Sequence, residues 1–309
     1  QQDYADWAAL PRSASAGEPA EPPEPLSGAS PALQSDCNEQ TSQDRYTAVV
    51  YSGLSYGSGW DEDIYFSRSL CQSAERLNQE TGSDFEPRVN QSVSAIAFVS
   101  ARNSTASKTI TNIYSMTVNG GEQRRLTYTQ GQDRTPSFSP DGSRIVFASD
   151  RAGNADIYVM NSDGSGVTAL TGAPEADVEP DWSPDGQHIA WVRRLNSGMG
   201  LLYVMDADGS NPVALLTAPF AGQPVWSPSG ARIAFRLDAD GDGWYDLATI
   251  NADGSGLSVL PLPKSHGPAA DLEMGGWLSE DAGLVYNEIF YQLYQGRWLI
   301  DYTFLYQVS

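Results

Sequence analysis

The sequence predicts an all-β protein: a single β-propeller of six four-stranded blades, preceded by an extended Pro-rich N-terminal arm. Two observations lead to this fold class. One block of residues recurs along most of the chain, and each copy divides into four short runs rich in β-branched and aromatic residues. A repeat of this kind cannot cover its own apolar faces, so neighbouring copies must stack on one another.

The repeat is plainest in three consecutive copies between residues 136 and 260. Each copy contains a Ser-Pro-Asp-Gly turn or a close variant, a strand that ends near a large aromatic residue, and a second turn of the Asp-Gly-Ser type. Pro presets the backbone at the first central turn position, and Gly adopts a conformation that other residues resist. These turns are therefore expected to join antiparallel strands. The first copy contains Pro136–Gly142, Arg144–Asp150, Asp156–Asn161 and Asp163–Gly166.

Weaker copies flank these three, and the aromatic residue of the second strand marks all six. Four-stranded antiparallel sheets that stack radially close a ring. We therefore assign residues 45–309 to the propeller, with blades at about 45–80, 85–128, 132–172, 177–218, 222–262 and 271–309. The marker residues are Tyr51, Phe98, Phe147, Trp191, Phe235 and Tyr286, which lie 44 to 51 residues apart.

Residues 1–44 differ in kind from the rest of the chain. Six of the 19 prolines fall between Pro11 and Pro31, among Ala, Ser, Gly and Glu. This composition is typical of a linker or an extended arm. The first ten residues include Tyr4, Trp7 and Leu10, which are apolar enough to dock, either on the chain's own propeller or on another copy of it.

The repeat resembles that of the TolB-like propellers, a family named after the periplasmic TolB protein. The tract from Ser139-Pro-Asp-Gly142 to Asp156-Ile-Tyr158 and its copies carry the resemblance. In that family the tract marks architecture rather than activity, so the resemblance implies the fold strongly and the function weakly. The chain departs from the pattern at Ser229, which replaces Asp, and at Leu278, where the motif of the last blade is replaced.

The charge balance excludes some classes of partner. The 39 acidic and 18 basic residues give a formal net charge of −21 and a pI of about 4.2. This balance repels phosphate backbones and anionic membrane surfaces, so we expect no nucleic acid partner. Because no run approaches the roughly 20 apolar residues that cross a bilayer, we also expect no membrane span.

We expect the protein to be secreted, extracellular or periplasmic. The chain begins at Gln1 without an initiator Met or a leader segment, as a processed secreted protein does. Cys37 and Cys71 are the only cysteines. An even pair in such a chain predicts one disulfide, with two buried thiols as the alternative.

The sharpest local signal is a D-x-D-x-D-G-x-x-D loop between the second and third strands of the fifth blade. Oxygen ligands at alternate positions suit Ca²⁺, which takes six to eight of them in a flexible shell. The corresponding loop of the third blade, residues 150–156, lacks the central acids. We therefore predict a structural Ca²⁺ site, with an acidic hairpin as the alternative. Its ligands would be Asp238, Asp240, Asp242 and Asp246.

Other polar motifs are interpreted structurally. Asp206-Ala-Asp208-Gly209 has too few acids for a metal site and is predicted to be a turn. Asp63, Asn112 and Asp156 recur just before third strands, where we expect them to bond to the preceding hairpin. Possible N-glycosylation acceptors are Asn90 and Asn103.

The sequence contains no recognisable catalytic centre. Gly53-Leu-Ser55-Tyr-Gly57 matches a hydrolase nucleophile pattern, but that pattern requires a strand-to-helix turn. We predict a non-catalytic structural or protein-interaction module, and more specifically a subunit of a filament or surface layer. Residues 1–35 would join one copy to the next, and such head-to-tail contacts propagate into an assembly. The alternatives are a monomeric TolB-like module that binds another protein or a small ligand, and a polysaccharide-active enzyme with its site at the propeller mouth.

Overall fold

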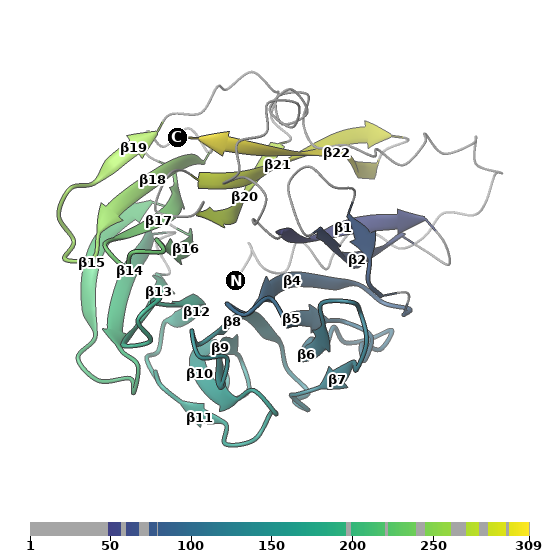
Figure 1. Ribbon diagram of the computed structural model, residues 1–309, viewed down its shortest axis with the longest axis horizontal. Coiled ribbons are helices and arrows are strands. Elements are labelled where there is room, and N and C mark those ends of the chain that lie inside the picture. Colours follow the sequence, from purple (N-terminus) through teal and green to yellow (C-terminus); the bar gives the residue numbers. More distant parts are fainter. Residues whose placement is uncertain are drawn as a thin grey trace.

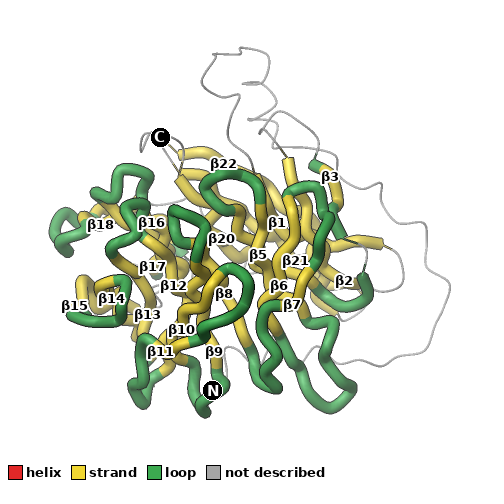
Figure 2. The backbone as a smooth tube through the Cα atoms, turned by 60° about the horizontal axis from the view of Figure 1, so that its bottom comes forward, coloured by secondary structure: helices red, strands yellow, loops and turns green. Residues whose placement is uncertain are grey.

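The computed structural model describes residues 49–56, 60–67, 74–78, 80–195, 199–219, 222–238, 245–260, 270–277, 284–294 and 297–308. This part of the chain consists of strands, turns and loops, without a helix (Figure 2). Figure 1 shows the sheets arranged around a central axis, as the blades of a propeller are. The predicted all-β propeller is confirmed.

Four sheets have the four strands expected of a blade. In each of them consecutive strands pair antiparallel, in the order of the sequence. The second blade contains β4 (Asp84–Val89), β5 (Ala95–Ser100), β6 (Asn112–Thr117) and β7 (Arg124–Arg125). The third contains β8 (Asp133–Phe138), β9 (Arg144–Ser149), β10 (Asp156–Asn161) and β11 (Thr168–Ala169). The fourth contains β12 (Ala176–Trp182), β13 (His188–Arg194), β14 (Met199–Asp206) and β15 (Val213–Pro219), and the fifth β16 (Gly222–Trp226), β17 (Arg232–Leu237), β18 (Asp246–Asn251) and β19 (Ser258–Leu260).

The first and last sheets have three strands each among the described residues. The prediction of six four-stranded blades is therefore confirmed for four blades, and the count of six, with four strands in each end sheet, stays a prediction. The strands of the first sheet are β1 (Val49–Tyr56), β2 (Trp60–Ser67) and β3 (Glu75–Arg76). Those of the last are β20 (Ala270–Trp277), β21 (Leu284–Tyr294) and β22 (Arg297–Val308).

The core lies between neighbouring blades. Strands β4, β8, β12 and β16 lie innermost, while β7, β11, β15 and β19 lie outermost (Figure 1). The second strand of each four-stranded blade is largely buried, because another sheet packs on either side of it. Phe147 of β9, for example, packs against Val99 and Ile113 of the second blade and Tyr158 of its own. The marker aromatics Phe98, Phe147, Trp191 and Phe235 are all fully buried.

The predicted turns close as their chemistry requires. In Ser139-Pro-Asp-Gly142 the Gly142 N–H donates to the Ser139 carbonyl at 2.8 Å. Hydrogen bonds from the Ser139 hydroxyl, together with those from Ser143, lower the pKa of Asp141 to about 2. Gly164, in the second turn of the third blade, has a φ of 89°. A Cβ at Gly164 would lie 2.8 Å from the Leu126 carbonyl oxygen of the preceding blade, so only glycine fits there.

Truncating a marker aromatic tests this packing. We expect Phe147→Ala to lower the free energy of unfolding by about 3–5 kcal/mol, because the ring is fully buried between blades. Denaturant titration measures the loss. Val213→Ala is the control, since Val213 lies on an outermost strand and is 57% exposed; it should change stability by less than about 0.5 kcal/mol. Similar losses in both variants would contradict an interblade core.

Candidate functional site

Buried acids gather at the end of the propeller where the innermost strands begin, which we call the mouth. Three innermost strands begin at or next to an aspartate that is inaccessible to solvent. Each aspartate pairs with an arginine at or just after the end of the second strand of the same blade, at N–O distances of 2.7 to 3.1 Å. The arginines are one-sixth to one-fifth exposed. The three pairs are Asp84 with Arg102, Asp133 with Arg151, and Asp177 with Arg193.

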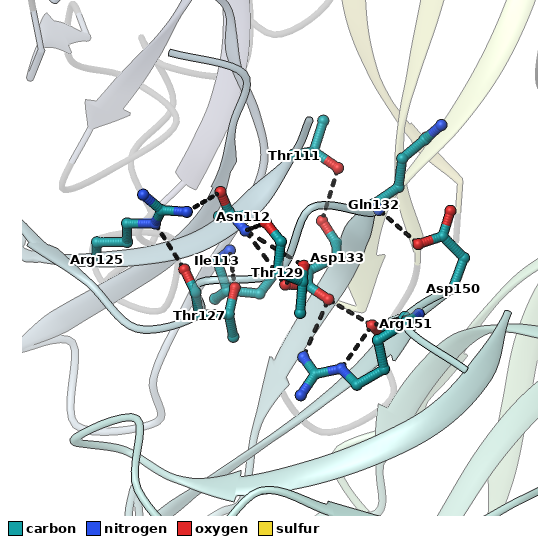
Figure 3. A network of polar contacts seen from close by, with 11 residues as sticks. Thr111, Asn112, Ile113, Arg125, Thr127, Thr129, Gln132, Asp133, Asp150 and Arg151 are labelled. Atoms are coloured by element: carbon teal, nitrogen blue, oxygen red, sulfur yellow. Dashed lines mark hydrogen bonds and ion pairs between the residues drawn. The ribbon is translucent and has the colours of Figure 1, made fainter. Parts of the chain in front are cut away.

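Figure 3 shows how the Asp133 carboxylate is held at the contact between the second and third blades. The Ser149 hydroxyl donates to Oδ1 at 2.5 Å, and the Arg151 guanidinium donates to the same oxygen at 3.1 Å. On the other side, the Thr129 hydroxyl donates to Oδ2 at 2.9 Å. A buried carboxylate without partners would be costly. Here each oxygen has a donor, so the charge joins the blade to the connection that precedes it.

Asp63, Asn112 and Asp156 bind residues in or just after the fourth strand rather than the preceding hairpin, so that expectation was wrong. Asp156 accepts a hydrogen bond from the Thr171 hydroxyl at 3.3 Å, two residues after β11. Arg125 of β7 donates to the Asn112 side-chain oxygen at 2.8 Å. In the first sheet, Asp63 forms the corresponding ion pair with Arg76 of β3 at 2.6 Å. The fourth strand is the outermost one, so these contacts hold it to the third strand in the first sheet and the second blade.

One to three residues after the start of strands β4, β8, β12 and β16, the backbone has an unusual conformation. The residue before the strand's proline has a positive φ, from 49° to 56°, in four consecutive blades. The register against the second strand shifts at the same place. Positive φ is uncommon for residues other than glycine, so its recurrence indicates an architectural bulge. The four residues are Glu86, Thr135, Glu179 and Gln223.

Two of these residues, Glu86 and Glu179, each join two adjacent blades near the central axis. The backbone N–H of Thr135 donates to the Glu86 carboxylate of the preceding blade at 2.7 Å. The backbone N–H of Gln223 donates to the Glu179 carboxylate at 2.6 Å. A glutamate at the bulge therefore binds the bulge of the next blade. Thr135 has a shorter side chain, and its buried hydroxyl oxygen has no hydrogen-bond partner.

Glu179 is the most strongly constrained acid of this group. Its carboxylate lies 3.1 Å from Nη2 of Arg194 and 3.9 Å from Nη2 of Arg236, and its side chain is 7% exposed. Burial by itself raises the pKa of Glu179. The two guanidinium groups and the Gln223 N–H outweigh burial and hold the pKa below its ordinary value of 4.5. Glu179 is therefore a fixed negative charge between two arginines.

Asp181, two residues further along the same strand, shows the opposite behaviour. It accepts a hydrogen bond from the Ser137 hydroxyl of the third blade at 2.8 Å and one from the Trp226 N–H of the fifth blade at 3.0 Å. Burial by the surrounding strands raises its pKa, although these donors and the nearby Arg88 act in the other direction. Asp181 thus links three blades at once.

Arginine side chains at the mouth also stack on aromatic rings. The guanidinium carbons of Arg102, Arg151 and Arg193 lie 4.6 to 4.9 Å from the centres of tyrosine rings on their third strands. Arg236 stacks in the same way over Tyr245, at 4.6 Å. Stacked and paired guanidinium groups are held in place yet keep N–H donors near the surface. Chemically, the mouth suits binding of carboxylates and peptide carbonyls.

The residues of the predicted Ca²⁺ loop are only partly described. Asp238 follows β17 and Asp246 begins β18, and both are buried. Asp240 and Asp242 lie outside the described residues. Among the residues that the structure describes, no group of three His, Cys, Asp or Glu side chains is arranged to hold a metal ion. The Ca²⁺ site stays a prediction.

The remaining predicted site residues are placed as follows. Asn90 is buried, and its side-chain oxygen accepts hydrogen bonds from the N–H groups of Ser94 and Ala95. The Asn103 amide donates to the Tyr114 hydroxyl at 2.7 Å. Both amide groups are therefore in use in the folded chain, and glycosylation stays a prediction. Cys37 and Cys71 lie outside the described residues, so the disulfide stays one too.

Two further expectations concern backbone structure. The Asp206–Gly209 segment forms the predicted turn, with the Gly209 N–H donating to the Asp206 carbonyl at 2.9 Å. In the hydrolase-like pattern, Gly53 to Tyr56 belong to β1 and pair with β2. No helix in the described part is long and apolar enough to cross a membrane.

Sequence reasoning missed the bulge residues and the buried acids of the mouth. A signal for them does exist. Asp-x-x-Pro recurs at Asp84–Pro87, Asp133–Pro136 and Asp177–Pro180, in register with the aromatic marker of each blade. The pattern could have located the buried aspartate and the residue before proline, though not the partners of either.

Comparison with known proteins decides the family. A family model described as the TolB beta propeller domain matches residues 104–271, more than half of the chain. The chain belongs to this family. A stretch of 49 residues is also 43% identical to the Tol-Pal system protein TolB of Bordetella pertussis and to that of Bordetella parapertussis. That stretch is 16% of this chain and spans 11% of the length of these curated relatives.

Solved structures share the propeller fold with this TolB-like chain. TolB from Acinetobacter baumannii superposes with a TM-score of 0.63 at 19% identity, over 82% of this chain and 63% of that one. A chain of a nidogen/laminin complex gives 0.61 at 11% identity, over 84% and 93%. An oligogalacturonate lyase in complex with manganese gives 0.52 at 14% identity, over 86% and 71%. At these identities the likeness establishes the fold alone.

The charge of Glu179 can be tested by Glu179→Gln, which keeps the shape of the side chain. We expect the free energy of unfolding at pH 7 to fall by about 1.5–3 kcal/mol, because two guanidinium groups lose their anionic partner. Since the folded pKa of Glu179 is lowered, the ionised form stabilises the fold above the ordinary pKa, and this contribution is lost as the pH falls through the folded pKa.

Denaturant titrations of both proteins between pH 7 and pH 2 measure the effect. The difference between them should shrink as the pH falls below 4.5. Glu122→Gln is the control, because Glu122 is exposed. A difference of constant size across this range would show that the charge of Glu179 plays no part.

Proposed function

We propose that the chain is a non-catalytic protein-interaction module whose partner binds at the mouth of the propeller. The observation that carries this proposal is the concentration of fixed arginine and carboxylate groups there, in a chain whose net charge is −21. Membership of the TolB propeller family supports it, since the curated relatives are named as proteins of the Tol-Pal system.

The chemistry of the mouth favours a polypeptide partner with acidic or carbonyl groups. Guanidinium groups form paired hydrogen bonds with carboxylates and carbonyls. Arg134 is the clearest candidate, because it lies on the innermost strand β8 and is 23% exposed. Its Nε donates to Gln132 at 3.1 Å, and its Nη1 lies 3.4 Å from the Glu86 carboxylate. The rest of the chain is strongly acidic, so attraction of an acidic partner is confined to the mouth.

Several finer features belong to this proposal. We propose an extracytoplasmic location, in the periplasm or outside the cell, and a ring of six blades in which the end sheets are the first and last. Assembly with other copies through residues 1–35 stays a proposal drawn from the sequence, since these residues lie outside the described ones. No observation favours the polysaccharide-active alternative, because the likeness to oligogalacturonate lyase concerns the fold alone.

Reversing one charge at the mouth tests the binding surface. The partner is first identified by cross-linking the full chain in its own cells, followed by mass spectrometry of the linked peptides. Its affinity is then measured for the unchanged chain and for Arg134→Glu, which should bind at least about tenfold more weakly and with a weaker salt dependence.

Arg124→Glu is the matched control for this measurement. Arg124 is exposed on the outermost strand β7, so its reversal should leave the affinity unchanged. Thermal unfolding of both variants checks that they fold. If Arg124→Glu weakened binding and Arg134→Glu did not, the partner would bind the rim and the proposal would be wrong.

The proposed structural Ca²⁺ site is tested by thermal unfolding of the full chain with Ca²⁺ or with a chelator. Ca²⁺ at about 100 times its dissociation constant should stabilise the fold by about 2.7 kcal/mol. The double variant Asp240→Ala, Asp242→Ala should lose this response. The control Asp206→Ala, Asp208→Ala alters a turn with a similar sequence and should keep it. If Ca²⁺ does not stabilise the chain without substitutions, the loop is an acidic hairpin and the proposed site is wrong.

A further inference from the structure

Strand β15 is the outermost strand of the fourth blade, and it differs from the outermost strands of the other four-stranded blades. It has seven residues, whereas β7 and β11 have two and β19 has three. Within the described part of the chain β15 pairs with β14 alone, so its other edge lies on the outside of the ring (Figure 1). Such an edge carries a row of backbone N–H and C=O groups that can bind another strand.

The length of β15 follows from a difference at one position. In the second blade the Thr127 hydroxyl accepts a hydrogen bond from the Ile113 N–H of the third strand at 2.9 Å, and the outermost strand ends two residues before Thr127. The third blade has the same contact. In the fourth blade Leu216 stands at this position and has no hydroxyl. Its backbone pairs with β14 instead, opposite Leu202, and the pairing continues to the end of β15.

The edge of β15 also lacks the charged side chains that keep most exposed strands apart. No charged residue occurs between Asp208 and Arg232. On β15 itself Val213, Ala214 and Thr217 are exposed. By contrast, β7 consists of two arginines. A chain with a net charge of −21 repels other copies of itself over most of its surface. An uncharged strand at the rim is therefore a place where two copies can meet.

We propose that β15 pairs with β15 of a second copy, antiparallel and about a two-fold axis, so that the two fourth blades form one continuous sheet. The segment that can pair is bounded by Pro212 and Pro219, neither of which has a backbone N–H. Its midpoint lies between Leu215 and Leu216, where the two-fold axis would pass. Because β15 shifts its register against β14 at Leu215, the irregularities of the two copies would meet at the axis.

The distribution of charge favours an antiparallel pair over a parallel one. Asp206 and Asp208 lie in the turn before β15. Hydrogen bonds from Ser210 lower the pKa of Asp208, so its carboxylate stays ionised. In a parallel pair the two acidic turns would lie side by side. In an antiparallel pair they lie roughly 23 Å apart, at opposite ends of the paired strands, which exceeds the Debye length of about 8 Å at physiological salt.

The contact involves one strand edge from each copy, which is less than a standard protein interface, so we expect a weak and reversible dimer. It lies at the rim and does not depend on the partner proposed for the mouth. Sedimentation equilibrium of the full chain, from micromolar to millimolar concentration, measures the dimer. A monomer at all concentrations would overturn the proposal.

The register can be tested by exchanging charges. In the proposed pair, Ala214 of one copy lies opposite Thr217 of the other. Ala214→Glu with Thr217→Glu therefore places like charges opposite each other and should weaken the dimer at least about tenfold. Ala214→Lys with Thr217→Lys should weaken it as well, although this variant lowers the net charge. Ala214→Lys with Thr217→Glu places a lysine opposite each glutamate and should restore the affinity to within about threefold.

The matched control is Thr168→Glu with Ala169→Glu. Both residues are exposed on β11, the outermost strand of the third blade, so this variant should dimerise as the unchanged chain does. Circular dichroism checks that each variant folds. A dimer that resists both like-charged variants would form through another surface, such as residues 1–35. A dimer that the Lys–Glu variant weakens as much as the like-charged ones would have a different register. Either result would overturn the proposal.

Discussion

The contact between neighbouring blades is the constraint on which the rest of the structure depends. A four-stranded sheet with apolar side chains on both faces has to be covered twice, and only another sheet of the same kind can cover it. Phe98, Phe147, Trp191 and Phe235 lie in these contacts and are fully buried. At the mouth, where the apolar contact ends, ion pairs between buried aspartates and arginines hold the strands together. Their charges are acceptable there because each has a partner within the same blade or the preceding connection.

The same contact explains why arginine stands at the mouth. Of the 18 basic residues, 16 are arginine and two, Lys108 and Lys264, are lysine. At the mouth an arginine does two things at once: it binds a buried aspartate through its N–H groups and lays its flat face on a tyrosine ring, as Arg151 does with Asp133 and Tyr158. The compact ammonium group of lysine has no planar face for the second contact. This double requirement favours arginine at the corresponding position of the second, third and fourth blades.

Architecture and binding capacity coincide at the innermost strands. The bulge recurs because the strand has to turn its N–H toward the neighbouring blade, yet the residue at the bulge varies from glutamate to threonine and glutamine. This variation gives neighbouring positions different electrostatics. Glu179 is held ionised by Arg194 and Arg236, while burial raises the pKa of Asp181 only two residues away. The proposed binding of a polypeptide at the mouth would use these fixed charges of both signs.

From the sequence alone the fold class, the aromatic markers, the turns and the family could be predicted, because each depends on local chemistry that repeats: Ser-Pro-Asp-Gly makes its turn wherever it occurs. The partners of the buried acids could not be predicted. Asp63 and Asn112 were expected to bond to the preceding hairpin and instead bind Arg76 and Arg125 of the outermost strand. Only the tertiary structure decides such contacts. The stacking of the strands within a blade and against its neighbours determines which donor reaches a buried carboxylate, and separation along the sequence does not predict that stacking.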